Sequence, residues 1–170
     1  IWIADKSTIG VNEPVKLTWT NDQNITFEKI ITLDENYLFS VDQRVINNSG
    51  LSFDLYPYGL SKRQGIPEMQ NFFILHEGPL SITDGVLEEY DYDDLKDDKK
   101  IKKSSVGGWI GMTDKYWQTA IIPNQNEPVQ QTYRYNFVNG IDNFQTDIAG
   151  ERIAISNNAT ISHNFKIFAG

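Results

Sequence analysis

The chain has 170 residues, of which 39% are hydrophobic and 12% aromatic, and this composition predicts one folded domain with a hydrophobic core. Its formal net charge of −8 argues against binding to nucleic acid or anionic lipid. Both partners repel an acidic surface unless basic residues gather on one face, and the sequence shows no such gathering. The chain contains no cysteine, which excludes disulfides and thiolate metal sites.

The sequence shows neither a targeting segment nor a membrane span. Its longest apolar runs, such as Phe72–Leu75, are far shorter than the roughly 20 residues that a spanning helix needs. The chain opens on "IWIAD" without a methionine or signal peptide, which predicts that it is an excised fragment.

Alternating apolar and polar residues predict β-strands along the first half of the chain. Val15–Thr20 and Ile25–Leu33 flank the polar turn "NDQN", a pattern typical of a β-hairpin with a four-residue loop. Further strands are predicted at Tyr37–Asn47, Leu51–Leu60 and Asn71–His76. This half of the chain therefore reads as a series of antiparallel strands.

His76 and Glu77 are the first residues that suggest chemistry, because a histidine and a carboxylate are what ring-opening of a hexose would use. Adjacent residues on a strand point to opposite faces, so the two converge only if the strand ends or bulges there, which the following "GP" permits. The other histidine, His163, is far away in sequence, and two histidines make a poor metal ligand set. Structural roles are favoured, and no catalytic residue, metal site or cofactor is predicted.

A strand predicted at Leu80–Tyr90 runs into a charged segment, Glu88–Lys103, in which acids come first and lysines follow. A calcium-binding EF-hand loop is excluded because Lys96 stands where that loop needs a glycine. The segment is predicted to be a solvated, protruding hairpin or loop, or else a docking surface for a partner. The residues predicted for such docking are Glu88, Tyr90, Tyr92, Asp94, Leu95 and Lys99.

Three glycines in "SSVGGWIGMTDKYWQTAIIP" allow two interpretations, a phosphate-cradling loop or the turns of a β-sheet. Their spacing matches neither known phosphate-binding pattern, so the sheet interpretation is favoured. It predicts a hairpin of Trp109–Met112 and Tyr116–Ile122, with Trp109 and Trp117 buried. The residues given this structural role are Gly107, Gly108, Trp109, Tyr116, Trp117 and Pro123.

The remaining strands are predicted at Gln130–Val138, Asn143–Ile155 and Thr160–Phe168, and no run of about 12 residues holds a helical period. Strands joined by short polar turns indicate an all-β antiparallel sandwich or barrel. No linker or repeat divides the chain, so residues 1–170 are predicted to form a single domain.

Four stretches together resemble the large periplasmic domain of the YidC family of membrane-protein insertases in Gram-negative bacteria. They are "PVKLTWTN", "ITFEKIITLDENYLFSVDQRVIN", "FFILHEGPLSITDG" and "GGWIGMTDKYWQTAIIP", and they occur in order over nearly the whole chain. The resemblance implies an antiparallel β-supersandwich, the galactose-mutarotase-like topology, with little helix. It also implies a periplasmic location in a multi-pass inner-membrane protein whose insertase activity resides in a helical bundle that is not part of this chain.

The resemblance implies a non-catalytic accessory domain that assists membrane-protein insertion. Its implied partners are the Sec translocon, the SecDF component and nascent membrane proteins, and no nucleic acid. The alternative is a carbohydrate-binding or aldose-epimerase-like β-sandwich, which the topology favours but no residue does, since a fold does not by itself confer a function.

Overall fold

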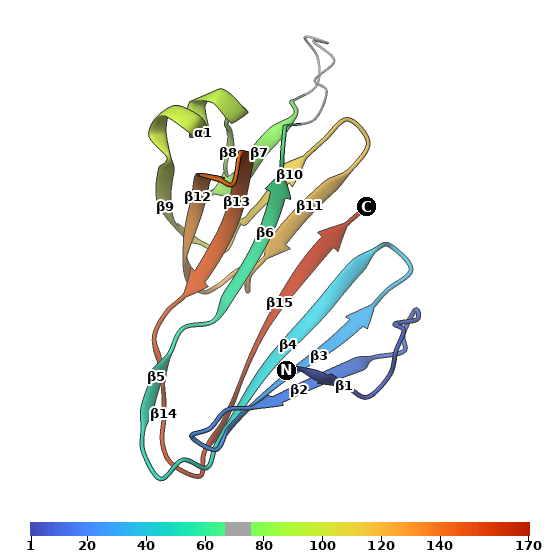
Figure 1. Cartoon of the computed structure of the whole chain (residues 1–170), viewed down its shortest axis with the longest axis vertical. Coiled ribbons are helices and arrows are strands. Elements are labelled where there is room, and N and C mark those ends of the chain that lie inside the picture. Colours follow the sequence, from blue (N-terminus) through green and yellow to red (C-terminus); the bar gives the residue numbers. More distant parts are fainter. Residues whose placement is uncertain (67–75) are drawn as a thin grey trace. The chain divides into compact units, whose positions relative to one another are not determined.

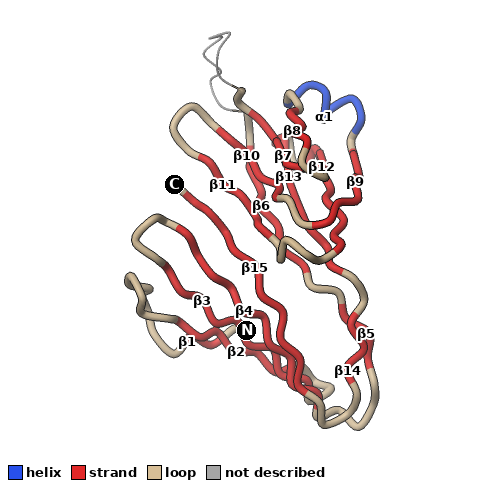
Figure 2. The backbone as a smooth tube through the Cα atoms, turned by 180° about the vertical axis from the view of Figure 1, so that it is seen from behind, coloured by secondary structure: helices blue, strands red, loops and turns tan. Residues whose placement is uncertain are grey.

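The computed structural model describes residues 1–66 and 76–170, and in this part the chain is built almost entirely from antiparallel strands with one short helix (Figure 1; Figure 2). The prediction of an all-β antiparallel fold is confirmed. Apart from His76, the strand predicted at Asn71–His76 lies outside the described residues. The chain divides into two compact units, Ile1–Pro57 with Glu151–Ile167 and Tyr58–Gly150 with Phe168–Gly170. Whether they act as a single domain stays a prediction.

The first unit contains a sheet in the strand order β1-β2-β3-β4-β15. Its strands are β1 (Ile3–Ala4), β2 (Val15–Thr20), β3 (Ile25–Leu33), β4 (Leu38–Asn47) and β15 (Thr160–Ala169). A separate pair joins β5 (Phe53–Leu55) to β14 (Ile153–Ile155). The hairpin predicted from the alternation is confirmed, with Val15 opposite Ile31 and Thr20 opposite Thr26.

The buried side chain of Asn47, at the end of β4, forms hydrogen bonds with two separate segments of the first unit. Its amide nitrogen donates hydrogen bonds to the carbonyl oxygens of Leu51 at 2.7 Å, Ser156 at 3.1 Å and Ile155 at 3.2 Å. Its amide oxygen accepts from the backbone N–H of Ser49 at 3.1 Å and from the Ser49 hydroxyl at 2.6 Å. One side chain thus satisfies backbone groups from two segments that are far apart in sequence.

The second unit contains two sheets that pack face to face. One has the order β11-β10-β7-β8 and the other the order β6-β13-β12-β9. The strands are β6 (Tyr58–Gln64), β7 (Gly78–Thr83), β8 (Val86–Glu89), β9 (Lys100–Val106), β10 (Trp109–Thr113), β11 (Gln118–Ile122), β12 (Pro128–Val138) and β13 (Ile141–Gly150). The C-terminal Gly170 exchanges backbone hydrogen bonds with Gln118 and so lies beside β11.

Side chains from both sheets form the core of the second unit, with Tyr133, Phe144 and Ile110 fully buried. Hydrogen-bonded polar side chains cross this core. The Thr83 hydroxyl donates to the side-chain oxygen of Gln131 at 2.7 Å, and the Gln131 amide nitrogen donates to the Ile82 carbonyl at 3.0 Å. Because these buried polar groups are paired across the two sheets, they fix the sheets to each other without an unpaired donor at Gln131.

Three of the predicted strands are each divided in the structure. Leu80–Tyr90 becomes the hairpin of β7 and β8, because Asp84 and Gly85 adopt positive φ angles of 48° and 81° and reverse the chain. Leu51–Leu60 becomes β5 and β6, and Asn143–Ile155 becomes β13 and β14. Alternation of apolar and polar residues did not reveal these breaks, because it continues in the strands on both sides of each break.

Candidate functional site

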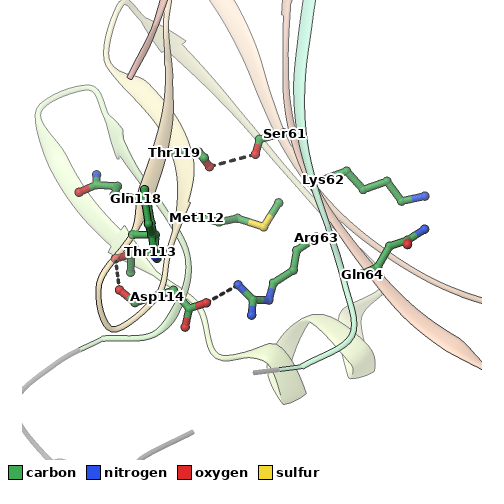
Figure 3. A pocket seen from close by; sticks show the side chains of 10 residues that line it. Ser61, Lys62, Arg63, Gln64, Met112, Thr113, Asp114, Gln118 and Thr119 are labelled. Carbon is green, nitrogen blue, oxygen red and sulfur yellow. Dashed lines mark hydrogen bonds and ion pairs between the residues drawn. The ribbon is translucent and has the colours of Figure 1, made fainter. Parts of the chain in front are cut away.

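A pocket of about 320 Å³ opens in the second unit between β6 and the β10–β11 hairpin (Figure 3). The residues around it are Ser61, Lys62, Arg63, Gln64, Met112, Thr113, Asp114, Trp117, Gln118 and Thr119. Strand alternation sorts the β6 residues into two sets. Ser61 and Arg63 point into the pocket, whereas the side chains of Lys62 and Gln64 project to the opposite side of β6 (Figure 3).

The polar groups that point into the pocket are paired with one another. Arg63 forms an ion pair with Asp114, and the hydroxyls of Ser61 and Thr119 lie 2.9 Å apart (Figure 3). Met112, which is 6% exposed, supplies an apolar thioether between these two pairs. No nucleophile lies beside a general base among these lining residues, so the pocket suits binding and not acid/base catalysis.

Two aromatic side chains are exposed at the turn beside this pocket. The backbone N–H of Asp114 donates to the carbonyl of Trp117 at 2.7 Å, which closes the turn, and β11 begins only at Gln118. Tyr116 is 77% exposed and Trp117 is 69% exposed. The prediction that Trp117 is buried within a strand is therefore wrong, because the turn extends two residues further on this side, through Tyr116 and Trp117, than the alternation indicated.

Gly108 and Gly111 lie where a side chain would collide with the backbone of a neighbouring strand. Gly108 has a φ of 74°, and a Cβ there would collide with the carbonyl oxygen of Ile82. A Cβ on Gly111 would collide with the carbonyl oxygen of Thr119 on the paired strand. Pro123 is buried directly after β11, and Trp109, which is predicted to be largely buried, is of intermediate exposure. The stretch is sheet architecture and not a phosphate loop.

The charged segment contains a helix, which the sequence pattern did not predict. Helix α1 (Tyr92–Asp98) begins after Asp91, whose backbone N–H donates to the Asp94 carboxylate at 3.3 Å. It ends at Lys99, which has a φ of 59° and donates its N–H to the Leu95 carbonyl at 2.9 Å. The interpretation of Glu88–Lys103 as a protruding hairpin or loop is therefore wrong, because local capping stabilises a helix of seven residues between two strands.

Two of the residues predicted to dock a partner belong to the core. Tyr92 is 1% exposed and packs edge-on against Phe144 with ring centroids 4.6 Å apart, and Leu95 is 0% exposed. Neither can contact a partner while the unit is folded. Asp94 on α1 and Lys99, which follows the helix, are exposed, so docking through this segment stays a prediction for its exposed residues only.

Glu88 and Tyr90 belong to a half-buried polar cluster. The Tyr90 hydroxyl donates to the Glu88 carboxylate at 2.6 Å, and the Lys103 ammonium lies 2.9 Å from the same carboxylate. The hydrogen bond from Tyr90, followed by that from Lys103, holds the pKa of Glu88 below its usual range. Burial, followed by the hydrogen bond to Glu88, raises the pKa of Tyr90, so the cluster remains a tyrosine bonded to a carboxylate at neutral pH.

The two histidines lie in different units. His76 and Glu77 belong to the second unit, where the His76 Nε2 lies 3.2 Å from the Pro79 carbonyl oxygen, and His163 belongs to the first. Neither His76 nor Glu77 lines the pocket. Over residues 1–66 and 76–170, no group of three or more His, Cys, Asp or Glu residues gathers as metal ligands would.

In the part of the chain that the structure describes, no helix has the length and apolar character needed to cross a bilayer.

The family model described as the YidC periplasmic domain matches residues 2–170.

Curated relatives named membrane protein insertase YidC match this chain along almost all of its length. The protein from Rickettsia canadensis is 38% identical over 171 residues, covering 100% of this chain and 30% of that protein. The protein from Cereibacter sphaeroides is 38% identical over 172 residues, covering 95% of this chain and 27% of that protein. The protein from Pelagibacter ubique is 38% identical over 169 residues, covering 98% and 29%. The chain thus spans less than a third of the length of these relatives.

Two solved structures match this chain at 8% sequence identity. A TPR-domain containing protein from Parabacteroides distasonis matches with a TM-score of 0.54, covering 99% of this chain and 34% of that chain. A putative aldose 1-epimerase from Klebsiella pneumoniae matches with a TM-score of 0.47, covering 94% of this chain and 52% of that chain. At this identity the first likeness concerns the fold alone.

Proposed function

Because the chain belongs to the family of YidC periplasmic domains, we propose that it is a non-catalytic accessory domain that assists membrane-protein insertion and folding by contacting other proteins. The family is one of insertases and not of enzymes, and it places the chain on the periplasmic side of the inner membrane. The contacts that we propose are with components of the Sec translocon, SecDF among them, or with segments of nascent membrane proteins.

The observation that carries this proposal is the pair of exposed aromatic residues beside the pocket. Tyr116 and Trp117 expose large apolar surfaces, and such residues are enriched where proteins bind one another. Since Arg63 and Asp114 already neutralise each other, the pocket offers apolar contact without an uncompensated charge. An extended segment of an emerging membrane protein has the apolar side chains that such a site would accept.

A second contact surface is proposed on the exposed face of α1. Asp93, Asp94, Asp97 and Asp98 are all exposed there and precede Lys99. A surface of this kind attracts a basic partner through forces that salt screens, and it suits a modest affinity. We assign this surface to a Sec component and the pocket to substrate segments.

Replacing Trp117 and Tyr116 together with alanine should weaken the binding of an extended apolar peptide to the chain by at least tenfold. Aromatic side chains at the centre of a contact typically contribute the largest share of binding, whereas the loss of two exposed side chains leaves the core intact. Peptide binding is measured by backbone amide chemical shifts in a titration, which also locate the peptide on the chain.

The matched control for this pair replaces Trp2 and Tyr56, which are 39% and 62% exposed in the first unit. The control should bind the peptide as the unmodified chain does. An equal loss in both variants, or shifts located away from β6 and the β10–β11 turn, would show that the pocket is not the binding site.

The chain should not accelerate the mutarotation of a hexose. His76 contacts the Pro79 carbonyl and lies outside the pocket, so it is not placed to act as an acid or a base on a sugar bound there. Polarimetry on the purified chain measures the rate directly. A rate above that of buffer which disappears in His76→Ala would favour the epimerase-like alternative over an accessory domain.

A further inference from the structure

The outer face of the β6-β13-β12-β9 sheet collects basic side chains that are far apart in the sequence. Across the four strands the register places Lys100 beside Arg134, Arg134 beside Gln145, and Gln145 beside Lys62. Side chains of directly paired residues share a face, so three cations occupy one row across the sheet. Lys102 lies two residues after Lys100 on β9, so its side chain is on the same face, in the neighbouring row of paired residues.

This face carries one carboxylate, and that carboxylate is already neutralised. Asp147 is 1% exposed, the Arg134 Nε donates to it at 2.6 Å, and the Gln145 amide donates to it at 2.8 Å. Lys62, Lys100 and Lys102 are exposed and make no ion pair within the described residues. In a chain of net charge −8, strand alternation has therefore separated a basic face from the acidic remainder.

Apolar side chains lie among these lysines. Tyr58 and Leu60 share the face of β6 that carries Lys62 and are 40% and 47% exposed, and Val106 on the same face of β9 is 58% exposed. Lysines with a tyrosine and aliphatic residues between them are the composition of protein surfaces that rest in the headgroup region of a membrane. A soluble acidic protein segment would match the lysines but not the exposed apolar groups.

We infer that this sheet face binds the surface of a bilayer that contains anionic phospholipid. The proteins of this family are inner-membrane proteins, so the rest of such a protein holds the domain close to a bilayer. Basic side chains at such a surface gain electrostatic attraction, and Tyr58 and Leu60 add apolar contact. The net charge of the whole chain argued against binding to anionic lipid. The sequence does not show this basic face, because its cations are brought together only by the pairing of four strands.

The test measures how the chain binds to vesicles of phosphatidylcholine with about 30% phosphatidylglycerol, compared with phosphatidylcholine alone, at low salt. We expect binding to the anionic vesicles only. The variant pair K62Q/K102Q should lower the partition constant by about 25-fold, since each lysine near such a surface contributes about fivefold. Lys100 is left in place because the acidic Asp97 and Asp98 precede it and make the charge at that end mixed.

The control pair K6Q/K166Q removes the same charge from exposed positions in the first unit and should change the partition constant less than twofold. Equal losses in the two pairs would mean that net charge and not this face governs binding. Equal binding to both kinds of vesicle, or no binding to vesicles but binding to soluble poly-glutamate through Lys62 and Lys102, would overturn the inference and assign the face to an acidic protein partner.

Discussion

Asn47→Ala is expected to lower the free energy of unfolding by about 3 kcal/mol, one of the two largest effects we predict for a single substitution in this chain. The Asn47 side chain is 0% exposed and donates to three backbone carbonyls, at Leu51, Ile155 and Ser156. Alanine removes all three of these hydrogen bonds at once, and a buried carbonyl oxygen left without a partner loses the full energy of its desolvation. Urea denaturation measures the change.

Asn48→Ala is the matched control, because Asn48 is the exposed neighbour of Asn47. Its hydrogen bonds with Asn24 are made by its backbone N–H and carbonyl, which alanine retains. It should cost no more than about 0.5 kcal/mol. If the two variants unfold at the same urea concentration, Asn47 does not hold the segments around β14 and β4 together in the way described.

Gly111→Ala is expected to lower the stability by about 3 kcal/mol, at the upper end of the cost of overpacking. The added Cβ would overlap the carbonyl oxygen of Thr119 and come within 2.8 Å of its carbonyl carbon, so β10 and β11 must separate. Backbone atoms in a central pair of strands cannot give way as a flexible side chain would. Thermal unfolding monitored by tryptophan fluorescence reports the loss.

Gly50→Ala separates this steric effect from backbone strain. Gly50 has a φ of 86°, but nothing lies within 4 Å of a Cβ built there. Alanine should therefore cost only the strain of the left-handed conformation, about 1 kcal/mol. A loss in Gly111→Ala no larger than that in Gly50→Ala would show that the strands accommodate the methyl group.

The strands that the sequence predicted correctly are those whose alternation ends at a recognisable turn. The hairpin of β2 and β3 has the predicted boundaries, because the polar residues between Thr20 and Ile25 mark a turn between two runs rich in β-branched and apolar residues. The fold class followed from the same signal. β10 and β11 were also found, and only their turn was misjudged.

The features that escaped prediction depend on contacts between distant segments. β9 was assigned to a charged loop, although Ile101 between two lysines shows the alternation of an edge strand. Helix α1 has only seven residues, too few to show a helical period, and it forms because the side chains of Tyr92 and Leu95 are buried. The pocket between β6 and β10 joins residues that are about fifty positions apart, which no local pattern records.

Photocrosslinking in the full-length insertase, with probes at Trp117, at Asp97 and at the buried Leu95, tests most directly whether this domain acts by contacting other proteins. During synthesis of a membrane protein, we predict adducts with the nascent chain from the Trp117 probe and adducts with a Sec component from the Asp97 probe. The Leu95 probe should give neither, because that side chain is 0% exposed. Adducts from none of the three positions, while probes elsewhere on the domain capture partners, would contradict the proposed contact surfaces.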